Sequence, residues 1–145
     1  ALKLNIPVLI HGSEPVGHKY PGKGDTTPEK LYSFISNFPQ NPIICAHWGG
    51  GLPFYYLMPE VSKVMDNVYF DTAASPFLYK KDIFPLMTKL IGANKILLGS
   101  DFPLLRAKRL INQIEKSELS EDERMAITTT NAMNLIGIDR FTTQM

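Results

Sequence analysis

The segments IPVLIH (residues 6–11), PIICAH (42–47) and ILLGSD (96–101) decide the fold of this chain. Each is a short apolar run that ends in a polar side chain, His11, His47 or Asp101. Runs of this kind are typical of strands buried in a parallel sheet. Parallel α/β folds gather the carboxyl ends of their strands on one face, where their chemistry lies. We therefore expect these three side chains to come together in space.

Strand-then-helix units follow one another along the chain. Strands are expected at residues 6–10, 43–46, 68–71 and 96–98. Helices are expected from residue 28, over 54–65, through 83–91, over 104–116 and over 121–136. Ser120 and Glu123 form a capping-box pattern before the last helix, and Gly92 and Gly137 are suited to helix ends. Strict alternation of strands and helices predicts a parallel sheet.

Two architectures fit this alternation: a small open doubly wound sheet, or half of a (β/α)₈ barrel. The four units in 145 residues scale to roughly 290 residues for eight units, an ordinary length for a barrel. The chain starts with Ala1 rather than an initiator Met, and only a short segment precedes the first strand. This start favours the half-barrel. Residues 1–145 are expected to form a single domain.

Composition excludes several classes of protein. The chain is 44% hydrophobic and 20% charged with a net charge of +1, which gives no reason to expect nucleic acid or a membrane surface as a partner. Cys45 is the only cysteine, so a disulfide framework is excluded. No apolar run approaches the roughly 20 residues that span a bilayer, and no signal peptide is visible. The cytoplasm is the expected compartment.

His11, His47 and Asp101 have the ligand types of a catalytic divalent metal. Each also has a simpler interpretation. A histidine at a strand end is often only a hydrogen-bonded structural residue, and an aspartate after a strand is a favoured helix N-cap. As a functional group, Asp101 would ligate a metal or take a proton from its bound water. The shared position of all three at strand ends favours function.

Two further segments are candidates for substrate contact. Trp48 and Gly49 follow His47, and the glycines after them allow a sharp turn and a close approach of substrate to the backbone. The loop of residues 12–26 is long for its place, which is typical of functional loops, and it carries His18. A nucleotide-binding loop is disfavoured, because neither GxxxxGK[ST] nor GxGxxG occurs.

The motifs PVLIHGSEP, AHWGGG, LLGSDFP and TTNAMNLIGI, in this order, resemble the second half of the amidohydrolase superfamily barrel. Within it they are most similar to the amidohydrolase-related branch, which includes aminocarboxymuconate-semialdehyde decarboxylase and similar aromatic-acid decarboxylases. The resemblance covers nearly the whole chain. It implies an α/β fold that is the C-terminal half, strands 5–8, of a (β/α)₈ TIM barrel, with parallel strands and outer helices.

The resemblance also implies roles for the three strand-end residues. His11 would be the metal ligand on the fifth strand, and His47, on the sixth, a second ligand or a catalytic acid/base. Asp101, on the eighth, would bind the metal and help activate water. The implied cofactor is a divalent metal, zinc or else manganese. The family takes further ligands from an HxH motif on its first strand, and this chain has no HxH.

The sequence therefore predicts a metal-dependent hydrolase or non-oxidative decarboxylase. Its substrate would be a small carboxylated or amide/ester-like molecule. The alternative is a non-catalytic half-barrel that needs a partner, or the N-terminal half of the barrel, to complete its fold and site. Either way we expect a small-molecule ligand, no nucleic acid or membrane partner, and either a homo-oligomer or completion by the N-terminal half.

Overall fold

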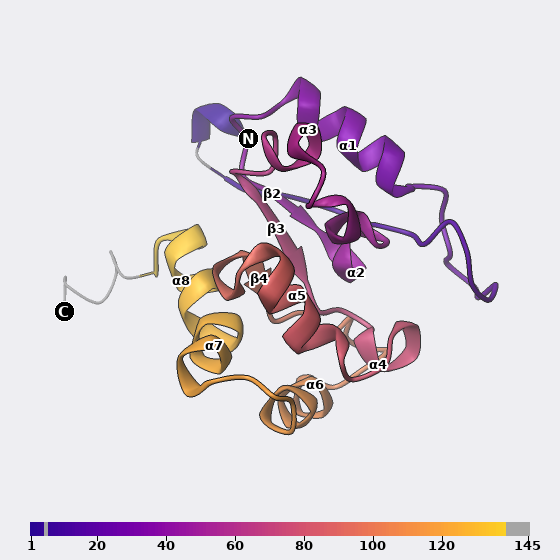
Figure 1. Cartoon of the computed structure of the whole chain (residues 1–145), viewed down its shortest axis with the longest axis vertical. Helices are drawn as coiled ribbons and strands as arrows, with labels where there is room; N and C mark the ends of the chain where they lie inside the picture. The colour runs from indigo at the N-terminus through magenta and orange to yellow at the C-terminus, as the bar shows by residue number, and fades with distance from the viewer. Residues whose placement is uncertain (5, 139–145) are drawn as a thin grey trace.

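A computed structural model describes residues 1–4 and 6–138 (Figure 1). At its centre is one sheet with the strand order β1-β2-β3-β4. The strands are Val8–Ile10, Ile43–Cys45, Val68–Asp71 and Ile96–Leu97. Neighbouring strands are parallel, with Ile43 opposite both Val8 and Val68, and Phe70 opposite Ile96. The predicted parallel α/β fold is confirmed, and the strands differ from the expected ranges only at their ends.

Alternation along the strands gives the sheet two unlike faces. Ile43 and Cys45 on β2 and Val68 and Phe70 on β3 are buried on one face. Leu9 lies on the other face and is 62% exposed. Because side chains alternate with a period of two, His11, two positions after Leu9, is directed to this open face. The core therefore lies on one face of the sheet, and β1 leaves the other face open.

Helices cover the buried face of the sheet. The three longer ones are α1 (Pro28–Asn37), α5 (Ile83–Ile91) and α6 (Ala107–Glu115). Their buried side chains join those of the sheet in one hydrophobic cluster, among them Leu31, Ile35, Phe84, Met87, Leu110 and Ile114. Full burial of an aliphatic or aromatic side chain of this size contributes about 1.5–3 kcal/mol.

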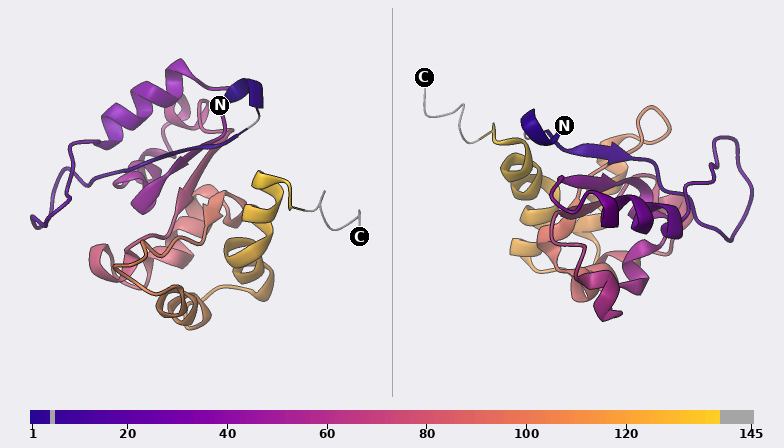
Figure 2. Two further views of the ribbon diagram at one scale, coloured as in Figure 1. Left: turned by 180° about the vertical axis from the view of Figure 1, so that it is seen from behind. Right: turned by 90° about the horizontal axis from the view of Figure 1, so that it is seen from above.

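Shorter segments connect these elements. They are η1 (Leu2–Leu4), α2 (Ala46–Gly49), η2 (Leu52–Tyr55), α3 (Pro59–Ser62), α4 (Ser75–Leu78), η3 (Ala93–Lys95), α7 (Glu121–Met125), η4 (Ala126–Thr130) and α8 (Asn131–Ile136). Figure 2 shows the loop between β1 and α1 reaching beyond the carboxyl ends of the strands. Among the described residues, no helix has the length and apolar character needed to cross a bilayer.

The expected helix over residues 54–65 is wrong. The structure has η2 and the short α3 there, separated by a turn. Pro59 occupies the first turn of α3, where its missing N–H does no harm, but within a continuous helix it would remove a hydrogen bond and clash with the preceding turn. The helix expected at 104–116 also starts late, at Ala107.

The last expected helix, 121–136, is present but contains a π-helical turn, η4. Its start is the predicted capping box. The Glu123 N–H donates to Ser120 Oγ at 3.2 Å, and the Ser120 N–H donates to Glu123 Oε2 at 2.7 Å. Within the π turn, the Ile127 carbonyl accepts a hydrogen bond from the Leu98 N–H at 2.9 Å. A wide turn in the helix thereby supplies a partner for the backbone directly after β4.

Candidate active site at the carboxyl ends of the strands

His11, His47 and Asp101 line one cavity of about 650 Å³. His11 follows β1, His47 follows β2, and Asp101 lies beyond β4. The imidazole centroids of His11 and His47 are 4.9 Å apart, with their planes at 70°. The structure thus brings together residues that lie far apart in sequence. His18, from the long loop, lines the same cavity.

A left-handed turn presents His47 to this cavity. Residues 47–51 all have positive φ, with 56° at His47 and 55° at Trp48. A non-glycine residue in this conformation costs on the order of 1 kcal/mol or more. Asp71, at the end of β3, holds the turn: its Oδ1 accepts from the His47 N–H at 2.8 Å and from the Ala73 N–H at 3.0 Å. Burial raises the pKa of this carboxyl, although the two N–H groups oppose the shift.

The imidazole of His47 is oriented by a backbone carbonyl. Its Nδ1 lies 3.1 Å from the Ala73 carbonyl oxygen. A carbonyl only accepts hydrogen bonds, so the hydrogen-bond network places a proton on Nδ1, and in the neutral imidazole Nε2 then carries the lone pair. The residue is 8% exposed. His47 is therefore held in the tautomer that a metal ligand or a general base requires.

His11 is held by the serine two residues after it. Its Nε2 lies 2.9 Å from Ser13 Oγ, which also accepts from the Gly24 N–H at 3.1 Å. Partial burial lowers the pKa of His11 from its usual 6.5, and the neighbouring His47 lowers it further, against the opposing effect of Asp101. The neutral imidazole is favoured, and only the neutral form ligates a metal or accepts a proton.

Two glycines set the spacing between the histidines. A Cβ on Gly12 would lie 2.7 Å from the Ala46 carbonyl oxygen, and a Cβ on Gly50 would lie 2.4 Å from that of Ser13. No side chain fits at either place, so the turn after β1 and the turn after β2 pack backbone against backbone. This contact fixes His11 relative to His47.

Trp48 and Gly49 lie behind the cavity wall and not among its lining residues. The Trp48 indole N–H donates to Ser75 Oγ at 2.7 Å, and the ring packs edge-on against Phe84 at 5.8 Å. A Cβ on Gly49 would lie 3.0 Å from the Phe70 ring. Both residues support the turn that carries His47. Their contact with a substrate stays a prediction.

Asp101 does not cap a helix. Its φ is 66°, and its carbonyl accepts from the Leu104 N–H at 2.8 Å within a turn. The next helix, α6, begins at Ala107 with Arg106 as its N-cap residue. The helix-cap interpretation is therefore set aside, and the Asp101 carboxylate remains exposed at the cavity.

Most of the cavity wall is apolar and was not found by sequence reasoning. The remaining lining residues are Tyr20, Pro21, Gly22, Ala74, Phe77, Leu78 and Leu104. The one signal for Phe77 and Leu78 is their place in TAASPFL, directly after the third strand end. Lys23, from the same loop as His18, does not line the cavity: its ammonium donates to the carbonyls of Val16 at 2.8 Å and His18 at 3.2 Å.

The donor types around the cavity fit a divalent metal. Two imidazoles, one with a free Nε2, and one carboxylate are the nitrogen and oxygen ligands of such sites. Within residues 1–4 and 6–138, however, no three His, Cys, Asp or Glu side chains are grouped closely enough to hold an ion. The ligand roles of His11, His47 and Asp101 stay a prediction.

Known proteins share this fold. One neighbour is 2,6-dihydroxybenzoate decarboxylase from Rhizobium, with 20% identity, a TM-score of 0.70, and 95% of this chain matched to 53% of that one. A dihydroxybenzoic acid decarboxylase from a Polaromonas species, with bound manganese and an inhibitor, has 20% identity and a TM-score of 0.71. Here 96% of this chain is matched to 52% of that one. 5-Carboxyvanillate decarboxylase from Sphingomonas paucimobilis has 14% identity and a TM-score of 0.69, with 92% of this chain matched to 50% of that one.

The chain thus spans about half the length of the solved structures that it matches. A family model described as amidohydrolase matches residues 1–138. The family match confirms the resemblance of the sequence motifs to the amidohydrolases. Because this family model covers nearly the whole chain, the chain belongs to the amidohydrolase family.

Proposed function

We propose that residues 1–145 form one domain, the C-terminal half (strands 5–8) of the (β/α)₈ barrel of a metal-dependent enzyme. The enzyme is a hydrolase or a non-oxidative decarboxylase. The family match over residues 1–138 and the barrel neighbours, about half of whose length is matched, support the assignment. The observation that carries it is the shared cavity of His11, His47 and Asp101, with the two imidazoles 4.9 Å apart.

In this proposal His11, His47 and Asp101 hold the ion, which is zinc, or manganese as in the Polaromonas neighbour. These residues would hold the ion, which would supply Lewis-acid chemistry: polarisation of a substrate oxygen and a pKa of roughly 7 for bound water. His47 would either bind the ion through Nε2 or, with Nε2 free of the ion, exchange a proton with the substrate there, because the Ala73 carbonyl holds the Nδ1 proton. Asp101, on the opposite strand end, accepts a proton from water.

The substrate proposed is a small carboxylated or amide/ester-like molecule. The apolar side chains of Phe77, Leu78 and Leu104 line the same cavity as the three polar groups. An apolar substrate body would lie against them and exclude water, while its polar group faces the histidines. His18, at the loop side of the cavity, is a further proposed substrate contact.

Elemental analysis of the purified chain tests the metal site. We expect close to one zinc or manganese per chain, lost in His11→Ala and Asp101→Ala and retained in His18→Ala, the matched histidine control. In the full-length enzyme, the first two substitutions should also abolish metal-dependent turnover. A wild-type rate in either variant, or metal bound equally in all of them, contradicts the proposed ligand set.

A second proposal concerns assembly. Leu9 on β1 is 62% exposed, and Leu4 and Ile6, just before the strand, are 73% and 51% exposed. Large apolar side chains exposed this close together in sequence are consistent with an interaction site. We propose that this surface is covered, by a second copy of the chain or by the N-terminal half of the barrel. A well-behaved monomer of 16.3 kDa in solution would argue against it.

A further inference from the structure

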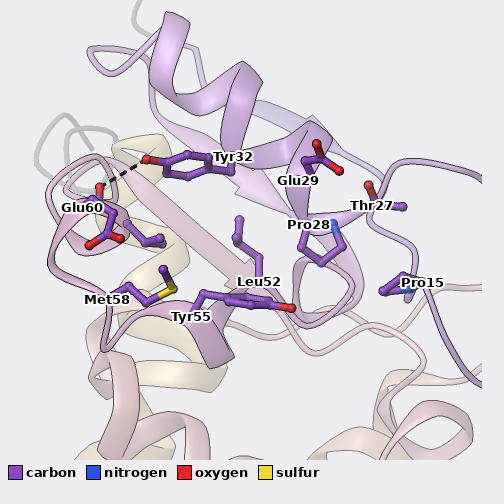
Figure 3. A pocket seen from close by; sticks show the side chains of 10 residues that line it. Pro15, Thr27, Pro28, Glu29, Tyr32, Leu52, Tyr55, Met58 and Glu60 are labelled. Atoms are coloured by element: carbon purple, nitrogen blue, oxygen red, sulfur yellow. Dashed lines mark hydrogen bonds between the residues drawn. The ribbon is translucent and has the colours of Figure 1, made fainter.

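A second cavity, of about 570 Å³, lies between α1, η2 and α3 (Figure 3). None of the residues that line it lines the candidate active site. Its floor is buried and apolar, with Leu52 only 2% exposed. A cavity of this size, with an apolar floor and few polar groups, is typical of a site for a small molecule.

Aromatic and thioether groups form the walls of this cavity. Figure 3 shows Tyr32 and Tyr55 on opposite sides, with Leu52 between them. Tyr55 is 50% exposed and Met58 is 43% exposed, so both keep apolar surface that a ligand would bury. Aromatic faces bind both apolar groups and cations, and a methionine side chain adapts to an irregular ligand.

The charge at the rim has one sign. Glu29 and Glu60 line the cavity, and no Lys, Arg or His does. The two glutamates come from different elements, α1 and α3, and are exposed. The Tyr32 hydroxyl donates to the Glu60 backbone carbonyl at 3.5 Å, which ties α1 to α3 across one end of the cavity. Because this hydrogen bond uses the backbone carbonyl of Glu60, neither carboxylate takes part in it.

We propose that this cavity binds an organic cation, a molecule with an apolar, ring-sized body and a protonated amine. Its body would lie on Leu52 between the two tyrosine rings. Its ammonium would face a tyrosine ring and one of the two carboxylates, which lie at opposite ends of the cavity in Figure 3. An anionic ligand of the same shape would be repelled by both carboxylates, and a neutral one would lose the attraction.

Three probes that share one body test the proposal: phenethylamine, phenethyl alcohol and hydrocinnamate carry the same phenylethyl group with a positive, neutral or negative end. Binding to the full chain is followed by NMR titration at low salt. We expect the amine to bind most tightly and hydrocinnamate most weakly. Equal affinity for amine and alcohol overturns the proposal.

Variants locate the binding. Combined Glu29→Gln and Glu60→Gln should remove the preference for the amine, by about two- to fivefold per carboxylate. Tyr55→Ala should weaken amine binding by about two- to fivefold. Glu118→Gln, at an exposed glutamate elsewhere, and Leu104→Ala, in the candidate active site, should leave it unchanged. The proposal is overturned if amine binding is lost only in Leu104→Ala. It is also overturned if amine binding weakens as protein concentration rises, because a second copy then covers the cavity.

Discussion

Gly50 shows how strongly one residue determines the site. It has a φ of 60°, and an added Cβ would lie 2.4 Å from the Ser13 carbonyl oxygen. We expect Gly50→Ala to destabilise the fold by about 2–4 kcal/mol, from the left-handed conformation and the clash together. The same change should separate His11 from His47 and weaken metal binding. Urea unfolding and metal titration measure the two effects.

Gly17→Ala is the matched control for this substitution. Gly17 also has a positive φ, 91°, but a Cβ there would have nothing within 4 Å. Only the conformational cost, about 1–2 kcal/mol, should appear. Equal losses of stability in the two variants would show that the backbone contact between the two turns does not contribute to the stability of the fold.

His11 should titrate below its usual pKa. Partial burial and the neighbouring His47 lower this pKa from 6.5. The folded state therefore holds fewer protons on His11 than the unfolded chain, so this residue's contribution to stability is full at high pH and declines as pH falls through 6.5. NMR titration of the metal-free chain measures the value. Replacing His47 with alanine should raise it, and an unchanged value would exclude the repulsion between the two rings.

At the scale of elements, the sequence located the strands better than the helices. The second and third strands are marked by the apolar runs IICA (43–46) and VYF (68–70), each bounded by proline or polar residues. The apolar positions in residues 54–65 have helical spacing, but Pro59 divides the segment, and the structure places it in the first turn of α3. Periodicity shows which residues are buried, but not whether a proline divides the segment that buries them.

The start of α7 provides a test of a sequence-predicted cap. Ser120 and Glu123 exchange backbone-to-side-chain hydrogen bonds of 3.2 and 2.7 Å. Ser120→Ala should destabilise the chain by about 1 kcal/mol. The combined Ser120→Ala and Glu123→Ala variant should lose less than the sum of the two single changes, because the two bonds belong to one motif. Thermal unfolding of the three variants decides whether they are coupled.

Asn131 connects α8 to the sheet. Its Nδ2 donates to the carbonyls of Ala93 and Ile96, each at 2.8 Å. Asn131→Asp keeps the shape but places an acceptor against two acceptors, so it should destabilise more than Asn131→Ala, which loses about 1–3 kcal/mol. Urea unfolding of both variants gives the order. A milder effect of aspartate than of alanine would mean that the two carbonyls find other donors.

For the whole molecule, the parallel sheet and the meeting of His11, His47 and Asp101 could be predicted because strand ends follow from local runs and parallel topology alone. The apolar side of the cavity could not. Phe77 and Leu78 lie in α4, and Leu104 lies in an irregular turn, where no periodic pattern marks a buried or functional face. The cavity between α1 and η2 could not be predicted from the sequence either, because it depends on how two outer segments pack against each other.

The open face of the sheet has a consequence for association. Leu9 is 62% exposed at the centre of β1. If this face is covered in solution, Leu9→Lys should shift the chain toward the monomer mass, since a charge is costly to bury. Leu57→Lys, at an apolar residue between η2 and α3 that is 79% exposed, is the control. Analytical ultracentrifugation of both variants should show the shift in the first only.

The run of positive φ from residue 47 to residue 51 also has a stereochemical consequence. This short stretch follows the mirror image of the path that L-amino acids prefer. A chemically synthesised chain with D-alanine at Gly51, whose φ is 96°, should form the turn more readily than one with L-alanine there. The turn that positions His47 would then accept a D-amino acid at residue 51, which ribosomal synthesis does not incorporate.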